Sequence, residues 1–208
     1  MRLNKEEILG IGKRMVELEK RALEQLEQTL DDNFVAAVEA IATSKGRIIV
    51  TGMGKSGHIA RKIASTLSSI GTPAIYLHPA EAEHGDMGVI TKNDILLALS
   101  YSGETSEVIN VVRFVNKLGN IIIAITGNNK SRLANTATIH LNIGVEHEDC
   151  VLNIVPTCST TAQLAMGDAI ATALIHIKGF NASDFACLHP GGYMDRRIKM
   201  LNHNHNLE

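Results

Sequence analysis

Five short apolar runs alternate with stretches of helical periodicity, and this alternation constrains the fold more than any other feature of the chain. The runs are apolar throughout instead of alternating with polar residues, which is typical of strands covered on both faces. Strands of this kind, separated by helices, predict a parallel sheet between helical layers, the α/β class. The expected strands cover residues 47–51, 74–77, 95–100, 121–126 and 138–143.

The helical stretches complete this pattern. Residues 4–31 carry apolar side chains at helical spacing among charged ones and predict a long amphipathic helix, followed by a second helix over 34–43 that Asp31 to Asn33 can cap. The remaining helices are expected over 57–69, 104–118, 131–136 and 160–177. We therefore divide the chain into N-terminal helices (1–44), which pack on the domain or on a neighbouring subunit, one α/β domain (45–200) and a tail (201–208).

Composition excludes several classes of protein. The 208 residues have a net charge of -2, so there is no basic excess for nucleic acid or an anionic membrane. The sequence holds no apolar run long enough to span a membrane and has a charged N-terminus, which predicts a cytoplasmic protein. The 3 cysteines lack paired spacing, which argues against a zinc or disulfide framework.

Ligands of parallel sheets bind beyond the carboxyl ends of the strands, where four polar loops are expected, over residues 52–57, 78–88, 100–105 and 144–159. The first, Gly52 to Gly57, matches the glycine pattern of dinucleotide sites, but the second strand ends in His78-Pro79 without the carboxylate that would hold a ribose. It is also no P-loop, because Ile49 stands where a glycine is needed. Either the glycines only permit a tight turn, or the loop presents Lys55 to a ligand.

Two further loops carry hydroxyl groups at helix starts. Ser100 to Thr105 surrounds a glycine with hydroxyls, and Thr157 to Thr161 is a second hydroxyl-rich start. Backbone N–H groups and the positive end of the helix dipole attract anions at such positions. Ser102 or Thr105 could equally cap the helix. Two such starts beside the Lys55 loop predict a phosphorylated ligand.

Acid–base candidates also lie in the expected loops, although each alone could be a solvated surface group. A metal site built from His84, His147 and the acids has no regular ligand spacing behind it, so we expect no metal and no other cofactor. The candidates are Glu81, Glu83, His84, Glu107, Glu146, His147, Glu148, Asp149 and His189.

In these stretches the sequence resembles the SIS (sugar isomerase) domain family, and within it the D-arabinose 5-phosphate isomerases. The matching segments occur in the family's order over about residues 45–200. They are Gly52-Met-Gly-Lys-Ser-Gly-His58, His78-Pro-Ala-Glu-Ala-Glu-His-Gly-Asp86, Ser100-Tyr-Ser-Gly-Glu-Thr-Ser-Glu107, Pro156-Thr-Cys-Ser-Thr-Thr161 with Met166-Gly-Asp168, and Asp184-Phe185 leading to His189-Pro-Gly-Gly192.

The resemblance implies a doubly wound, flavodoxin-like sheet of five parallel strands and an enzyme that interconverts D-ribulose 5-phosphate and D-arabinose 5-phosphate for the biosynthesis of 3-deoxy-D-manno-octulosonate (Kdo). It also implies dimers paired into tetramers with shared active sites. The family's catalytic positions match Lys55, Glu107, Glu148 and His189. We expect the substrate and its phosphate to contact Gly54, Ser56, His84, Ser100, Ser102, Gly103, Thr105, Thr157, Ser159 and Thr160.

Aldose–ketose exchange needs a base, a group that stabilises the cis-enediolate and a group that opens the sugar ring. Either Glu148 or Glu107 could be the base. Lys55 would stabilise the enediolate, and His189 would open the ring or relay a proton. A hydride shift would instead need a bridging metal.

The chain departs from the family at Tyr101, where Asn or Gln is common, and at Cys158, where Ser is common. Many relatives continue into CBS regulatory modules, which this chain lacks, so we expect feedback to act at the isomerase site, with CMP-activated Kdo as the inhibitor. Rival readings are an isomerase of a hexulose or heptose phosphate, and a non-catalytic sugar-phosphate sensor. A sensor that regulates transcription would need a helix-turn-helix, and residues 1–44 are too acidic to resemble one.

Overall fold

A computed structural model describes residues 3–145, 148 and 155–190 of the chain. His147, one of the metal candidates, and the expected tail over 201–208 lie outside these residues. Within the described ranges, no helix combines the length and the apolar character that crossing a bilayer requires.

The five expected strands form one parallel sheet in the order β2-β1-β3-β4-β5. This is the flavodoxin-like order, so the predicted fold class is confirmed. The strands are β1 (Ile48–Gly52), β2 (Ala74–Leu77), β3 (Ile95–Leu99), β4 (Ile122–Thr126) and β5 (Ile139–Asn142). All five lie within one residue of the ranges that the apolar runs predict.

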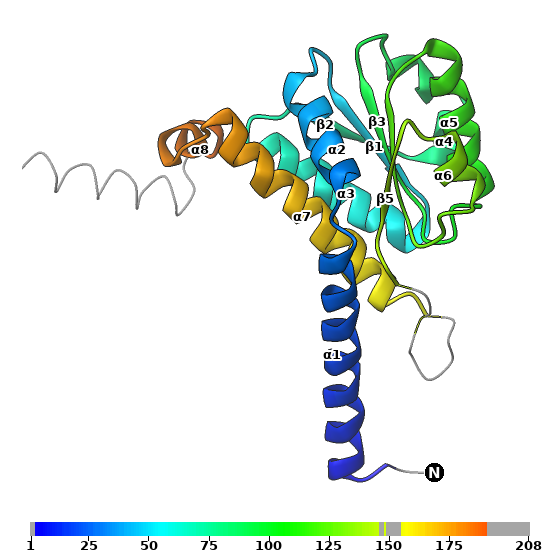
Figure 1. Cartoon of the computed structure of the whole chain (residues 1–208), viewed down its shortest axis with the longest axis vertical. Coiled ribbons are helices and arrows are strands. Elements are labelled where there is room, and N and C mark those ends of the chain that lie inside the picture. Colours follow the sequence, from blue (N-terminus) through cyan, green and yellow to red (C-terminus); the bar gives the residue numbers. More distant parts are fainter. Residues whose placement is uncertain (1–2, 146–147, 149–154, 191–208) are drawn as a thin grey trace, which may run out of the picture.

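Helices cover both faces of the sheet (Figure 1). One layer contains α2 (Asp32–Thr43), α3 (Gly54–Ser69) and α7 (Cys158–Lys178), and the opposite layer contains α5 (Ser106–Leu118) and α6 (Arg132–Thr136). Three short elements were not predicted: α4 (Pro79–Ala82), the 3-10 turn η1 (Asp86–Val89) and α8 (Ala182–Leu188). Each is seven residues or shorter, too short for helical periodicity to show.

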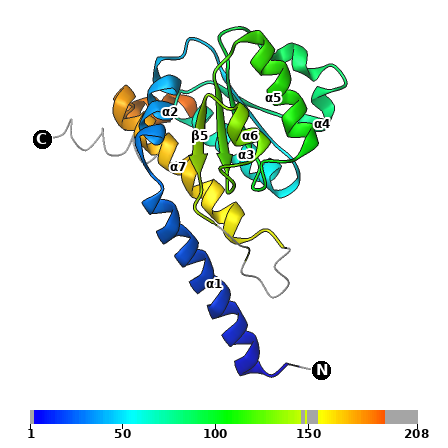
Figure 2. The ribbon, with the colours of Figure 1, turned by 45° about the vertical axis from the view of Figure 1, so that its right-hand side comes forward.

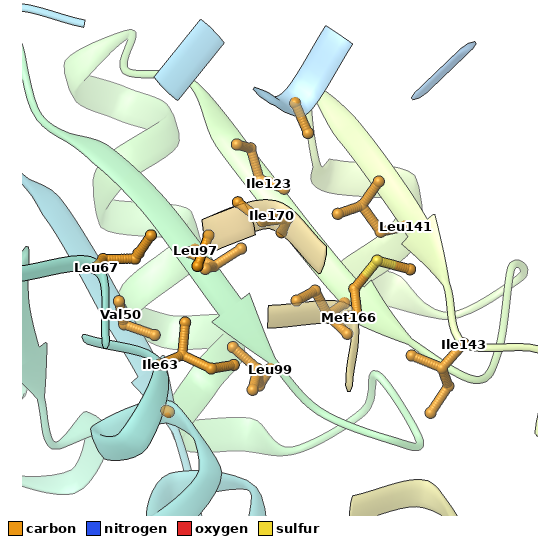
Figure 3. Packing of buried hydrophobic residues seen from close by; sticks show 14 of the residues in the cluster. Val50, Ile63, Leu67, Leu97, Leu99, Ile123, Leu141, Ile143, Met166 and Ile170 are labelled. Carbon is orange, nitrogen blue, oxygen red and sulfur yellow. The ribbon is translucent and has the colours of Figure 1, made fainter. Parts of the chain in front are cut away.

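The sheet is buried on both sides because side chains along each strand point alternately to two apolar clusters. On β3, Leu97 and Leu99 face the cluster under α3 and α7, whereas Leu96 and Ala98 face the cluster under α5. Figure 3 shows the first cluster, in which Ile170 of α7 lies over the sheet. The residues drawn there are Val50, Leu97, Leu99, Ile123, Leu141 and Ile143 from the sheet side, with Ile63, Leu67, Met166 and Ile170 from the helices.

The first helix, α1 (Lys5–Gln28), projects from the body (Figures 1 and 2). Its last turns pack on α7 and bury Ala22 and Leu26, and the hydroxyl of Thr29 donates to the carbonyl of Asn142 at 2.7 Å. Its N-terminal half, by contrast, exposes Ile8 and Ile11 by more than half. The apolar face of α1 is thus only partly covered within one chain.

Candidate functional site

The candidate site lies where β1 and β3 end side by side. Gly52, the last residue of β1, is paired with Leu99, the last residue of β3. β2 lies on one side of β1, and β3 lies on the other side. The chain therefore runs from the end of β1 into one helical layer and from the end of β3 into the opposite layer. Flavodoxin-like sheets bind ligands at this reversal of strand order.

The loop after β1 turns at once into α3. Gly54 has a φ of +59°, and a Cβ on Gly57 would come within 2.6 Å of the Gly52 carbonyl oxygen, so the tight turn requires glycine at both positions. No side chain caps α3. Lys55 lies exposed in the first turn, and among the described residues it takes part in no ion pair.

The loop after β3 has its hydroxyls in place around a second glycine. The Ser100 hydroxyl accepts the N–H of Gly103 at 3.1 Å and lies 3.0 Å from the Thr105 hydroxyl. Ser102 accepts the N–H of Glu104 at 3.2 Å. Thr105 precedes α5 without a side-chain cap on the first amides, so the hydroxyls order the loop and leave the helix end available to an anion.

The second hydroxyl-rich start is occupied. The Glu148 carboxylate, which is 6% exposed, accepts the N–H groups of Thr157 at 3.0 Å, Cys158 at 3.1 Å and Ser159 at 3.2 Å. A carboxylate is the acceptor that a helix N-terminus favours. In this arrangement the chain's own acid, and not a ligand, fills the start of α7.

Side chains also cap most of the other helices. At the starts of α1, α2, α6 and α8, a side chain accepts a hydrogen bond from a backbone N–H of the first turn. The capping residues are Asn4, Asp31, Ser131 and Asn181, respectively. Among the described helices longer than one turn, only α3 and α5 begin with neither a side-chain cap nor Glu148 on their amides. Both begin at the reversal point of the sheet.

Glu107 lies in the first turn of α5, partly exposed. Its own backbone N–H, followed by the Ser106 hydroxyl at 3.0 Å, holds the pKa of its carboxyl below the ordinary value. One turn further along α5, the amide of Asn110 donates to Glu83. This contact places the segment with His84 beside the face of α5 that carries Glu107.

His189 lies at the other end of the molecule. It follows α8, stacks on the Phe185 ring at 3.9 Å between centroids, and its Nδ1 is 2.9 Å from the Phe185 carbonyl. α7, with 21 residues, spans roughly 30 Å, and it separates the start that binds Glu148 from α8 (Figures 1 and 2).

The predicted site residues therefore fall into two groups. Lys55, Glu107 and Glu148 lie at the starts of α3, α5 and α7, whereas His189 follows α8, beyond the opposite end of α7. Sequence reasoning missed the Glu148 contact with α7 and the contact between Glu83 and Asn110. Within the described ranges, no three side chains of the His, Cys, Asp or Glu type lie close enough to hold a metal ion.

Comparison with known proteins identifies relatives of this chain. The model of the SIS domain family matches residues 40–173. The arabinose 5-phosphate isomerase KdsD of Pseudomonas aeruginosa is 50% identical over 187 residues, and KdsD of Escherichia coli K12 is 46% identical over the same length. Both alignments cover 90% of this chain and 57% of the relative, so the chain spans little more than half the length of these relatives.

A solved structure is similar over its whole length. The c3406 protein of E. coli CFT073, in complex with arabinose 5-phosphate, superposes with a TM-score of 0.87 at 35% identity. The alignment covers 90% of this chain and 100% of the other.

Proposed function

The chain belongs to the SIS domain family, and from that premise we propose that it is an isomerase interconverting D-ribulose 5-phosphate and D-arabinose 5-phosphate. The observation that carries the proposal is the pair of uncapped helix starts, α3 and α5, beside Lys55 at the reversal point of the sheet. Relatives named as arabinose 5-phosphate isomerases, at 46% to 50% identity, support the choice of substrate.

The phosphate would bind at the start of α5. There the hydroxyls of Ser102 and Thr105 lie in the loop that leads into the helix, and no side chain caps the first amides of α5. The start of α7 is a weaker candidate, because a phosphate would have to displace the Glu148 carboxylate from three N–H groups. Thr157, Ser159 and Thr160 then shape the site without holding the phosphate.

The reaction moves a proton between C2 and C1 through a cis-enediolate, whose negative charge Lys55 would stabilise. We assign the base to Glu107, because its carboxylate is partly exposed, is ionised at neutral pH and accepts a single side-chain hydrogen bond. Both oxygens of Glu148 are engaged by α7, so this residue would hold the start of α7 at the rim of the site.

His189 would open the sugar ring from a neighbouring subunit. The length of α7, which separates His189 from the helix start that binds Glu148, and the half-exposed apolar face of α1 both support a homo-oligomer with shared sites, which we expect to be a tetramer. Mixing Lys55→Ala with His189→Ala subunits should then restore activity, because some sites receive one intact residue from each chain. Verified subunit exchange without recovery would contradict sharing.

We also place the enzyme in the cytoplasm, as a supplier of Kdo biosynthesis. CMP-activated Kdo is the expected inhibitor, because its anionic groups suit the start of α5 and Lys55. Inhibition should be competitive with ribulose 5-phosphate and should disappear together with ligand-induced thermal stabilisation in a variant carrying Ser102→Ala and Lys55→Ala. Millimolar ligand without inhibition or stabilisation would exclude it.

The activity is tested by incubating purified protein with ribulose 5-phosphate, with and without a chelator, and by detecting arabinose 5-phosphate in a coupled assay. Turnover that survives the chelator is expected. Hexulose 6-phosphate and heptose phosphate substrates serve as comparison, and a higher kcat/KM with either would assign the enzyme to that sugar. Binding of sugar phosphates without turnover of any of them would favour a sensor.

A further inference from the structure

The loop between β3 and α5, residues 100–105, is bound along one side to the segment between β4 and α6. The Tyr101 carbonyl accepts the N–H of Gly127 at 3.0 Å, and the Gly103 carbonyl accepts the N–H of Leu133 at 3.1 Å. The Glu104 carbonyl accepts Nη2 of Arg132 at 2.9 Å. Three carbonyl groups of the loop thus point toward residues 127–133.

This orientation matters for an anion. A trans peptide places its N–H opposite its C=O, so the N–H groups that follow these carbonyls face away from residues 127–133. The Glu104 N–H donates to the Ser102 hydroxyl, whereas the amides of residues 102 and 105 point away from residues 127–133 and so suit an anion on the other side of the loop. Turning any of the three carbonyls around would bring negative charge toward the phosphate.

Backbone packing fixes part of this orientation. Gly103 has a φ of +66°, and a Cβ there would lie 2.1 Å from the hydroxyl oxygen of Ser131, which is 1% exposed and caps α6. The side chains of Glu104 and Arg132 form a further contact between the loop and α6. The Glu104 carboxylate accepts the Arg132 N–H at 2.7 Å through Oε1 and Arg132 Nε at 2.5 Å through Oε2.

We propose that Glu104 and Arg132 are positioning residues, which hold the peptide groups of loop 100–105 in the orientation that binds the phosphate. The inference rests on the proposed function for the identity of its ligand. The Arg132 guanidinium donates hydrogen bonds to both the carboxylate and the main-chain carbonyl of Glu104, whereas a simple surface ion pair binds only the carboxylate. The same bonds, first that of the guanidinium, hold the pKa of the Glu104 carboxyl below its ordinary value.

The test is Arg132→Met in the full chain, with two readouts: steady-state kinetics on ribulose 5-phosphate, and calorimetric binding of inorganic phosphate. Loss of the guanidinium should raise KM and the phosphate Kd together by about fivefold, since both side chains are about half exposed, while kcat changes by less than about twofold. Arg132→Lys keeps the charge but cannot reach both acceptors, and should fall between wild type and Arg132→Met.

Lys62→Met is the matched control. It removes an ion pair to Asp168 that joins α3 to α7 and is about equally exposed, but that lies away from the loop. Its KM and phosphate Kd should stay at wild-type values. If Arg132→Met weakens phosphate binding no more than this control, the two residues only stabilise the fold and the proposal is overturned.

Two further outcomes are distinguishable. A wild-type protein that does not isomerise ribulose 5-phosphate, but whose phosphate Kd still rises on Arg132→Met, would reject the proposed function and retain the role of Glu104 and Arg132. Should Arg132→Met not fold, Glu104→Gln replaces it, because the amide oxygen can still accept the Arg132 N–H while the charge is lost. Unchanged phosphate affinity in Glu104→Gln would overturn the proposal.

Discussion

The starts of α5 and α7 look alike in sequence and differ in the structure. Each has several Ser or Thr residues in its first turn or just before it. At α7 the Glu148 carboxylate takes three backbone N–H groups, whereas at α5 the hydroxyls bond one another and the loop. Hydroxyl-rich composition therefore marks a helix start that can bind an anion, and only tertiary structure shows whether the chain supplies that anion itself.

The largest expected effect is on kcat, and it distinguishes Glu107, the proposed base, from Glu148, which binds the start of α7. Glu107→Gln should lower kcat by about 10²-fold or more, the scale of losing a general base, and Lys55→Ala should act on the same scale through the enediolate. Steady-state kinetics on folded variants measure this. A greater loss in Glu148→Gln than in Glu107→Gln, with the fold intact, would reverse the two assignments.

The next effect concerns phosphate affinity. Ser102→Ala with Thr105→Ala should raise KM by about tenfold and leave kcat within about twofold, because contacts to a non-reacting phosphate bind ground state and transition state alike. The corresponding pair Thr157→Ala with Thr160→Ala should raise KM several times less. Equal increases in the two double variants would remove the distinction between α5 and α7.

A smaller effect is expected on stability. Glu148→Gln leaves an amide oxygen at the start of α7 in place of a carboxylate, and should lower the free energy of unfolding by about 1 kcal/mol. Denaturant titration measures it, with Glu39→Gln as the control, since Glu39 is an exposed acid inside α2. Equal stability of the two variants would show that the contact contributes nothing to folding.

The smallest effect is on pH dependence. Because the pKa of Glu107 is held below its ordinary value, the carboxylate stays ionised as pH falls, and activity is lost only below the usual range of a glutamate. Ser106→Ala removes one of the bonds that lower this pKa, so the acid limb of kcat/KM should move to higher pH. Ser69→Ala, at the far end of α3, should not move it. A limb that is unmoved in Ser106→Ala would exclude Glu107 as the titrating base.

Much of the fold follows from the sequence, because the strands β1, β3 and β4 are almost entirely apolar, and burial of both faces is typical of strands in a parallel sheet. The strand order, which places the ends of β1 and β3 side by side, is expected from the family resemblance and not from the alternation of strands and helices. Two features of the site do not follow from the sequence. Glu148 bonds to residues 9 to 11 positions further along the chain, at the start of α7, and the length of α7 separates His189 from that start. No residue pattern near either position indicates these tertiary relations.

The central claim is that the sugar phosphate binds at α5 while Glu148 keeps the start of α7. A crystal structure of the Lys55→Ala variant, soaked with arabinose 5-phosphate, tests it most directly. The account predicts the phosphate within hydrogen-bond distance of the Ser102 and Thr105 hydroxyls, with Glu148 still accepting the amides of Cys158 and Ser159. A phosphate seated on those α7 amides, with the Glu148 carboxylate displaced, would contradict it.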